Sequence, residues 1–271
     1  MIKEIFGIPE EPFKRNKLTL LKQQADIKTV LLMHARQGGL NIVIGEPGTG
    51  KSILRNDLEA MAQTDKSLVL ACIQRTMHTY TNILFQLINA LQLTVEKGKS
   101  KQMEKSLIEE AHRINSQGRK LITIIDEAHL LDLEVLRKLR LLFDEFPNNH
   151  NIILFAQTEL LNRLSMRVYE DMKSRITYSA KLYPLNQEQM MEYIFKEIQD
   201  AELPANVFDE NAIDLIIRSV DGNLRLCRNL CYGSLVETVH AKQKIVTNQM
   251  VNRVLIQPHW RSHEELITGG V

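Results

Sequence analysis

The sequence predicts an α/β fold, a doubly wound parallel sheet followed by a small all-helical domain. Apolar strand-like runs alternate with helical patterns between residues 41 and 182, and strands separated by helices form parallel crossovers. A glycine-rich loop joins the first strand to the helix after it. From Tyr183 onward the pattern is helical only. These three observations divide the chain into a sheet domain and a helical domain.

The elements of the sheet domain follow from the period of their apolar residues. The run Leu121-Ile122-Thr123-Ile124-Ile125 is typical of a strand that is buried on both faces. The predicted strands are 41–45, 67–73, 120–126, 151–156 and 176–182. The predicted helices are 20–37, 51–62, 79–91, 101–117 and 132–144.

The helical domain is delimited by capping residues. Asn186, Asp209, Asn223 and Thr247 are predicted to cap helices at 187–200, 210–220, 223–240 and 248–256. Around these elements we predict an irregular N-terminal segment 1–17, a core 18–183, a helical domain 184–257 and a tail 258–271. Within 1–17, Phe6 and Phe13 are expected to anchor the segment onto the core.

The composition is that of a globular protein, with 44% hydrophobic and 25% charged residues in a chain of 271. A net charge of +1 gives no argument for nucleic acid. Three cysteines without metal-ligand spacing predict neither a disulfide framework nor a zinc site, and Cys227 and Cys231 are expected to pack inside a helix. No apolar run reaches the roughly 18 residues of a membrane helix. We therefore expect a cytoplasmic protein.

The loop "GEPGTGKS" matches the pattern GxxxxGK[ST] and lies between a strand and a helix. Its backbone N–H groups and the helix N-terminus suit phosphate, Lys51 suits β and γ oxygens, and Ser52 suits Mg²⁺. The alternative is a chance glycine turn. The predicted nucleotide-binding residues are Gly45, Glu46, Pro47, Gly48, Thr49, Gly50, Lys51, Ser52 and Ile53.

Two carboxylates follow the buried strand "LITII". Asp126 is predicted to hold Mg²⁺ through water, and Glu127 to orient and activate the attacking water. The alternative is a strand that leads into a solvated loop. His129 lies nearby without an assigned role, and we expect a surface or capping histidine.

Gln157 and Thr158 follow the strand "NIILFA", where a polar group lies beside the expected γ-phosphate. Gln157 is our first choice for holding the water or sensing the phosphate. The alternative is a polar pair that simply ends the strand.

Arginines complete the predicted site, because phosphoryl transfer gains from a cation supplied in trans. Arg175 precedes the last strand and is predicted to reach a neighbouring subunit's nucleotide, with Arg163 and Arg167 as alternatives. Arg225 opens a helix of the second domain and is predicted to sense phosphate, ahead of Arg228. Each of these arginines also fits a surface position.

These motifs occur in the order of the AAA+ ATPases. "FGIPEEPF", "GEPGTGKS", "IIDEAHLL", "FAQTELLNRL" and "DGNLRLCRNLC" more narrowly resemble the ExeA-like (secretion-pathway ATPase A) family over nearly the whole chain. The resemblance implies a P-loop AAA+ αβα parallel-sheet domain with a helical lid. It also implies ATP and Mg²⁺ as cofactors, and a ring or helical homo-oligomer.

The ExeA-like family includes secretion proteins and ATPases of mobile elements that are similar to the MuB and TnsC regulators. Secretion members are expected to continue into a transmembrane segment and a cell-wall-binding region. This chain ends at Val271 without either, which we interpret as the mobile-element branch. That branch implies assembly on double-stranded DNA, recruitment of a transposase or adaptor, and target selection in transposition. The alternatives are a secretion-assembly ATPase and a non-catalytic nucleotide-gated scaffold.

Local support for DNA binding comes from the lysines of the segment "VEKGKSKQMEK" at 95–105, which joins two helices, and from Arg75 after the second strand. Arg75, Lys97, Lys99 and Lys101 are predicted to track duplex phosphates. A solvated charged loop is an equal alternative, because Glu96 and Glu104 are interleaved with the lysines.

Overall fold

We describe a computed structural model of the chain, covering residues 2–14, 20–74, 79–95 and 99–260. The chain folds into two compact units. One comprises Leu18–Leu182, and the other combines Met1–Lys17 with Tyr183–Val271.

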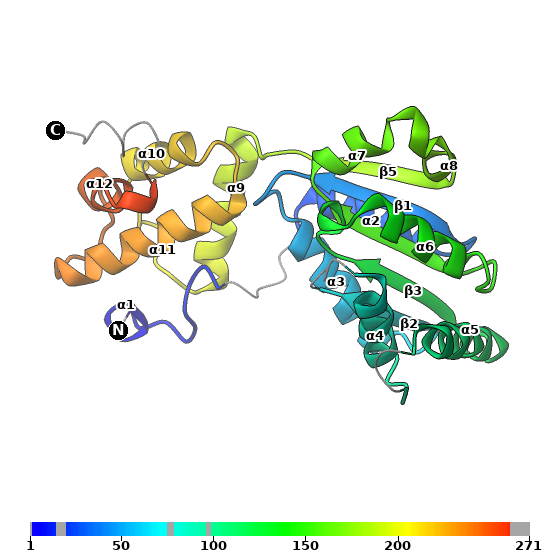
Figure 1. Cartoon of the computed structure of the whole chain (residues 1–271). Coiled ribbons are helices and arrows are strands. Elements are labelled where there is room, and N and C mark those ends of the chain that lie inside the picture. The colour runs from blue at the N-terminus through cyan, green and yellow to red at the C-terminus, as the bar shows by residue number, and fades with distance from the viewer. Residues whose placement is uncertain (1, 15–19, 75–78, 96–98, 261–271) are drawn as a thin grey trace. The chain divides into compact units, whose positions relative to one another are not determined.

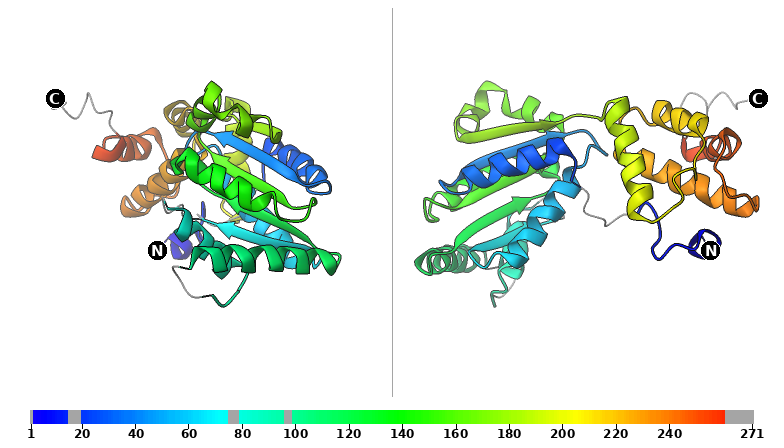
Figure 2. Two further views of the ribbon diagram at one scale, coloured as in Figure 1. Left: turned by 45° about the vertical axis from the view of Figure 1, so that its right-hand side comes forward. Right: turned by 180° about the vertical axis from the view of Figure 1, so that it is seen from behind.

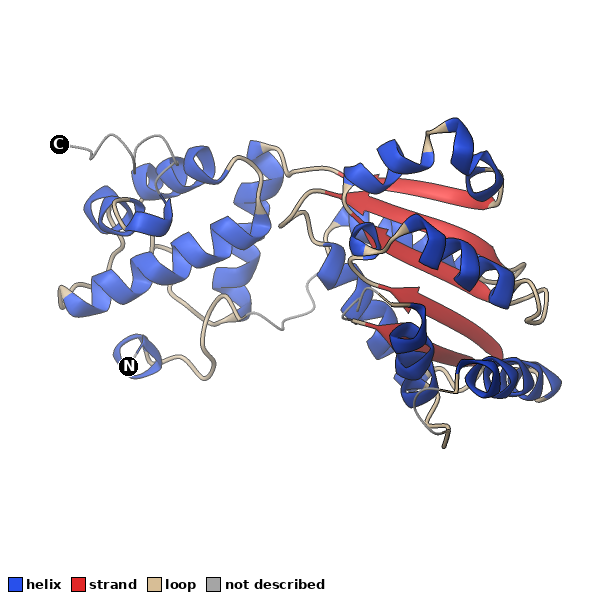
Figure 3. Cartoon of the chain, in the orientation of Figure 1, coloured by secondary structure: helices blue, strands red, loops and turns tan. Residues whose placement is uncertain are grey.

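The first unit contains a five-stranded parallel sheet in the order β2-β3-β4-β1-β5 (Figures 1 and 3). This confirms the predicted fold class. The strand that precedes the glycine loop, β1, lies between β4 and the edge strand β5, and β4 is the central strand, between β1 and β3. The strands are β1 Gly39–Gly45, β2 Leu68–Ile73, β3 Lys120–Ile125, β4 Asn151–Ala156 and β5 Ile176–Leu182.

Helices cover both faces of the sheet, so its strands are apolar on both sides. On β1, Ile42 and Ile44 pack toward one face and Val43 toward the other, and all three are fully buried. The first face is covered by α4 Tyr80–Ala90, α5 Ser100–Ser116 and α6 Leu133–Phe143. The second is covered by α2 Lys22–His34 and α3 Lys51–Thr64, seen from behind in Figure 2.

A short helical segment that no sequence pattern predicted connects β4 to β5. It comprises α7 Thr158–Leu164, the 3₁₀ turn η2 Arg167–Tyr169 and α8 Glu170–Lys173. Two arginines of α6 bind the carboxylate of Asp171 in α8, Arg137 at 3.1 Å and Arg140 at 3.4 Å. These ion pairs join α8 to α6 across 31 residues or more of sequence.

The helical unit contains α9 Gln187–Asp200, α10 Glu210–Val220, α11 Leu224–His240, α12 Asn248–Leu255 and the 3₁₀ turn η3 Pro258–Trp260. The carboxamides or carboxylates of Asn186, Asp209 and Asn223 accept N–H groups of the following turn, as predicted. Thr247 occupies the N-cap of α12, but its side chain makes no capping hydrogen bond to the described residues, so that prediction is wrong in its mechanism. Its backbone carbonyl accepts from Met250 instead.

The N-terminal segment differs from the prediction. Ile2–Phe6 form a short helix, α1, which ends at Gly7 in the left-handed conformation (φ 66°). Five residues are too few to show a helical period in the sequence. Phe13 is buried, but it packs edge-to-face on Phe208 of the helical unit at 6.3 Å rather than on the sheet. Phe6 is only half-buried.

The two cysteines of α11 pack as predicted. Cys227 and Cys231 are fully buried free thiols whose sulfur atoms lie 4.0 Å apart. Among the helices that the structure describes, none is long and apolar enough to cross a membrane.

Candidate nucleotide-binding site

The glycine loop connects the carboxyl end of β1 to the first turn of α3. Gly48 (φ 87°) and Gly50 (φ 97°) adopt left-handed conformations that other residues rarely adopt, which lets the loop turn tightly. A Cβ atom on Gly45 would lie 2.5 Å from Thr49 Oγ1. The loop backbone therefore encloses a space that a side chain at Gly45 would fill. This space lies at the N-terminus of α3, where the first N–H groups have no partners within the helix. These features fit a phosphate group.

The loop's lysine is held in place by the loop itself. Lys51 is buried (7% exposed), and its Nζ donates to the carbonyl oxygens of Gly45 at 2.5 Å and of Glu46 at 3.1 Å. Thr49, also buried, donates its hydroxyl to the Glu46 carbonyl at 2.8 Å. The cation is thus positioned inside the loop by two main-chain acceptors.

The two carboxylates that follow β3 lie in different environments. Asp126 is buried, and its Oδ1 accepts the N–H of Glu127 at 2.9 Å. Its Oδ2 accepts from Nη1 of Arg55, a residue of α3 that was not among the predicted site residues. Glu127 has a left-handed backbone (φ 51°) and a side chain that is 41% exposed. The buried carboxylate suits a fixed ligand, and the open one suits contact with water.

His129 is buried, so the prediction of a surface histidine is wrong. Its side chain is 6% exposed, in the 3₁₀ turn η1 Ala128–Leu130, and its Nε2 lies 3.5 Å from Glu127 Oε2. Its Nδ1 is buried and has no hydrogen-bond partner in the part of the chain that the structure describes. The turn folds back under β3 because Ala128 and Leu131 are buried in the apolar core, and this carries His129 inward.

The end of β4 contributes Thr158 to the loop. The Thr158 hydroxyl donates to Oε1 of Glu46 at 2.9 Å, 112 residues away in sequence. Gln157, our first choice, is the N-cap residue of α7 and is half-buried. Because β4 lies between β1 and β3, both residues lie between the glycine loop and Asp126.

A second contact to the loop comes from α2. Gln24 is fully buried, and its Nε2 donates to the carbonyl of Thr49 at 3.2 Å. Nothing in the polar sequence around Gln24 signals this contact. Arg55 did have a signal, because it follows Lys51 by four residues and so shares its helix face.

The donors present fit a magnesium ion that arrives with a nucleotide. Ser52 lies exposed in the first turn of α3, and Asp126 supplies a carboxylate. In the described part of the chain no group of three or more His, Cys, Asp or Glu side chains forms a metal site. Two oxygen ligands are typical for Mg²⁺, which relies on phosphates and waters for the rest.

The candidate arginines of the sheet unit are placed very differently. Arg163 donates to the carbonyls of His129 at 2.8 Å and Leu131 at 3.0 Å, so it supports the turn after β3. Arg167 is exposed in η2. Arg175 is exposed and directly precedes β5. The seven residues of β5 place Arg175 about 23 Å from the strand's carboxyl end, at roughly 3.3 Å per residue.

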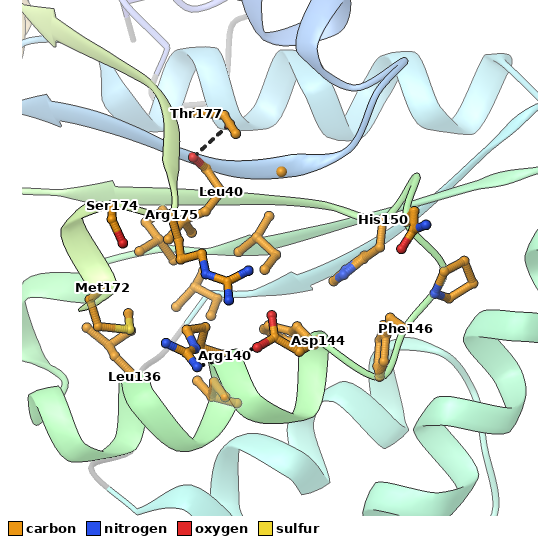
Figure 4. Close-up of a pocket in the computed structure, with 18 residues that line it drawn as sticks. Leu40, Leu136, Arg140, Asp144, Phe146, His150, Met172, Ser174, Arg175 and Thr177 are labelled. Atoms are coloured by element: carbon orange, nitrogen blue, oxygen red, sulfur yellow. Dashed lines mark hydrogen bonds and ion pairs between the residues drawn. The ribbon is translucent and has the colours of Figure 1, made fainter. Parts of the chain in front are cut away.

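Arg175 lines a pocket of about 650 Å³ at the amino edge of the sheet. Figure 4 shows its side chain pointing into this pocket, toward Arg140 and Asp144. His150 lines the same pocket, and burial lowers the pKa of its imidazole to about 3. The pocket lies at the opposite edge from the glycine loop, so it is not the phosphate site.

The remaining predicted residues lie elsewhere. Arg225 is exposed in the first turn of α11, in the helical unit. Lys99 is the N-cap residue of α5 and Lys101 is exposed in its first turn. Arg75 and Lys97 lie outside the described residues.

A parallel sheet in the order β2-β3-β4-β1-β5, with a lysine-bearing glycine loop after β1 and an acidic end to β3, defines a P-loop ATPase domain of the AAA+ class. Residues 34–164 match the family model described as AAA domain. The chain thus carries an AAA+ ATPase domain, a class whose members generally hydrolyse nucleotide. A search of the curated proteins found no match.

Solved structures with the same fold include archaeal ORC and Cdc6 proteins. The ORC2 protein of Aeropyrum pernix, solved as ADPNP–ADP complexes, has a TM-score of 0.73 at 15% identity, covering 96% of this chain and 74% of that chain. CDC6P of Pyrobaculum aerophilum has a TM-score of 0.73 at 16% identity, and the match covers 99% of this chain and 74% of that chain. The Aeropyrum pernix ORC1 protein in complex with DNA has a TM-score of 0.67 at 15% identity, and the match covers 88% of this chain and 65% of that chain. At these identities the likeness establishes the fold.

Proposed function

We propose that the protein is an ATPase that binds and hydrolyses ATP with Mg²⁺, assembles as a ring or helical homo-oligomer on double-stranded DNA, and regulates target selection in transposition by recruiting a transposase or adaptor. The observation that carries the ATPase part is the convergence of the glycine loop, Asp126, Glu127 and Thr158 at one edge of the sheet.

At this edge each side chain has a task that its surroundings support. Lys51 neutralises β and γ phosphate oxygens, and Ser52 and Asp126 hold Mg²⁺, which stabilises charge on the transferring phosphoryl group. Glu127 orients and activates the attacking water, for which its exposed carboxylate is suited. Gln157 or Thr158 senses the γ-phosphate. Thr158 has the additional support of its bond to the loop residue Glu46.

Two arginines are proposed to couple the nucleotide to assembly. Arg175 lies at the edge opposite to its own phosphate loop, so the nucleotide it serves belongs to a neighbouring copy. The ion pairs of Asp171 with Arg137 and Arg140 support the helix that precedes it. Arg225 in the helical unit is proposed to sense phosphate from a second rigid body.

The proposed binding of double-stranded DNA is supported by a structural relative and by basic residues of the chain. ORC1, which shares the fold, was solved in complex with DNA. Lys99 and Lys101, together with Arg75 and Lys97, offer cations for a duplex backbone. Target selection and transposase recruitment come from the motif resemblance to the mobile-element branch.

Assembly on DNA tests the proposal. Purified protein is mixed with random-sequence duplex and ATP, a slowly hydrolysed ATP analogue or ADP, and followed by gel shift and negative-stain imaging across a salt series. We expect rings or filaments on DNA with ATP or the analogue, which weaken steeply as salt rises. Failure of the ATP-bound, folded protein to bind DNA at low salt would favour a secretion-type partner.

Paired lysine variants locate the DNA contacts. Replacing Lys99 and Lys101 by Ala is expected to lower the slope of log affinity against log salt by about 1 to 2. The matched control replaces Lys196 and Lys244, two exposed lysines of the helical unit, and leaves the slope unchanged. An equal decrease of the slope in both variants would show that DNA binding depends on the net charge of the protein and not on Lys99 and Lys101.

A further inference from the structure

We propose that Arg55 competes with the metal for Asp126 and thereby sets the magnesium requirement of nucleotide binding, with Glu59 as the second carboxylate that receives Arg55. This inference rests on the proposed binding of Mg²⁺ and ATP at the same edge of the sheet. It assigns a role to two residues of α3 that lie outside the glycine-loop pattern.

The first support is that both oxygens of Asp126 have partners within the chain. Oδ1 accepts the Glu127 N–H at 2.9 Å, and Oδ2 accepts from the Arg55 guanidinium. The two side chains are 14% (Arg55) and 6% (Asp126) exposed, so water screens the ion pair only weakly. A metal ion that uses this carboxylate therefore meets a competing cation.

Arg55 cannot relieve the competition by losing its charge, because a guanidinium stays protonated in proteins. A divalent ion held between Ser52 and Asp126 repels a guanidinium bound to the same carboxylate. Release of Arg55 from Oδ2 lowers that repulsion. Arg55 also donates to the Asn56 amide oxygen, from Nε at 3.2 Å and from Nη2 at 2.6 Å. A neutral amide does not compensate a partly buried charge, so the released guanidinium is best stabilised by another carboxylate nearby.

Glu59 provides that carboxylate. It lies one turn after Arg55 on α3, with its Oε1 already 3.4 Å from Arg55 Nε. Two side chains of β2 and its end hold Glu59 in place. The Gln74 amide donates to it at 3.3 Å. Burial and a hydrogen bond to Glu59 raise the pKa of the Cys72 thiol, so the thiol remains a protonated donor.

The arrangement predicts opposite effects for the two partners of Arg55. Arg55→Met removes the competing cation, so less Mg²⁺ is needed. Glu59→Gln removes the alternative partner, so Arg55 stays on Asp126 and more Mg²⁺ is needed. A purely structural ion pair would predict lower stability in both variants and no change in the magnesium requirement.

The measurement is a Mg²⁺ titration of fluorescent-ATP binding, with melting temperatures recorded in EDTA. We expect Arg55→Met to lower the half-saturating Mg²⁺ concentration about tenfold and Glu59→Gln to raise it severalfold, on the scale of partly screened charge pairs. Arg55→Lys keeps the charge and should stay within about threefold of wild type.

Arg140→Met is the matched control. Arg140 is similarly buried (21% exposed) and contacts two carboxylates, Asp144 at 3.5 Å and Asp171 at 3.4 Å, but at the opposite edge of the sheet. The Arg140→Met variant should have a lower melting temperature than the wild type and the same magnesium requirement. An unchanged requirement in Arg55→Met, or shifts of the same sign in Arg55→Met and Glu59→Gln, would overturn the inference while the proposed ATP binding stands. A folded wild-type protein that binds no nucleotide with or without Mg²⁺ would overturn both.

Discussion

At the carboxyl edge of the sheet, β1, β3 and β4 end in a buried lysine loop, a buried carboxylate and a threonine that bonds the loop. At the amino edge, Arg175 points into a pocket that is lined by both apolar and polar side chains, including the neutral His150 (Figure 4). The first edge concentrates side chains that suit phosphate and Mg²⁺. The second offers an arginine with no phosphate site of its own nearby.

If Arg175 serves a neighbouring copy, as we propose, the two edges are complementary between copies rather than within one. Arg175 is separated from its own loop by the length of β5. A second copy that places its carboxyl edge against the first copy's amino edge would complete the site. Such a head-to-tail contact generates rings or helical filaments.

The largest effect is expected from removing the arginine at the amino edge. Arg175→Ala should lower the rate of ATP hydrolysis about a thousandfold with nucleotide affinity nearly unchanged, because a cation supplied in trans acts mainly on the transition state. Steady-state hydrolysis and fluorescent-ATP binding measure the two quantities. Lys173→Ala, an exposed cation two residues earlier, is the control and should retain the wild-type rate. An equal loss of affinity in Arg175→Ala would show a role in folding or binding.

A smaller effect is expected at the carboxyl edge. Glu127→Gln should lower turnover at least about a hundredfold while ATP-dependent assembly persists, since the amide cannot accept a proton from water. Hydrolysis and light scattering measure turnover and assembly. Glu159→Gln, in the first turn of α7, is the matched control. Turnover that is negligible in the wild type and unaltered by Glu127→Gln would favour a nucleotide-gated scaffold.

The smallest effect concerns stability at the amino edge. Burial lowers the pKa of His150 to about 3, and the unfolded chain has a histidine pKa of about 6.5. The unfolded state therefore takes up the proton first, so the contribution of His150 is complete above pH 6.5 and is lost as pH falls toward 3. At pH 5 the loss is about 2 kcal/mol, at 1.36 kcal/mol per pH unit.

The pH dependence is checked by urea unfolding at pH 7.5 and pH 5. His150 bonds the Thr123 hydroxyl at 2.9 Å and contacts Phe143 and Phe146. His150→Gln removes the titrating group. The variant should have a lower free energy of unfolding than the wild type at pH 7.5, but that free energy should change less between pH 7.5 and pH 5. An equally steep loss in the variant would assign the pH dependence to other groups.

Much of the fold was predictable from the sequence because its signals are local. Alternating apolar runs predicted all five strands, and Asn186, Asp209 and Asn223 marked three helix starts. The glycine loop was predictable because its pattern is contiguous. The N-terminal helix α1 was missed, since five residues carry no period.

The polar contacts of the site were not predictable in the same way. Arg55 and Asp126 are 71 residues apart, and Thr158 and Glu46 are 112 apart. No local pattern records which strand ends become neighbours, so the bond from Thr158 to Glu46 could not be predicted. The burial of His129 likewise depends on the core beneath its turn.

The most direct test of a site shared between copies is hydrolysis by a mixture of two inactive variants. Glu127→Gln keeps Arg175, and Arg175→Ala keeps Glu127, so a mixed assembly contains interfaces with both groups intact. For random mixing at equal concentrations we predict recovery to about a quarter of the wild-type rate, because one interface in four is then complete. No recovery in co-assembled mixtures would contradict a site completed by Arg175 of a neighbouring copy.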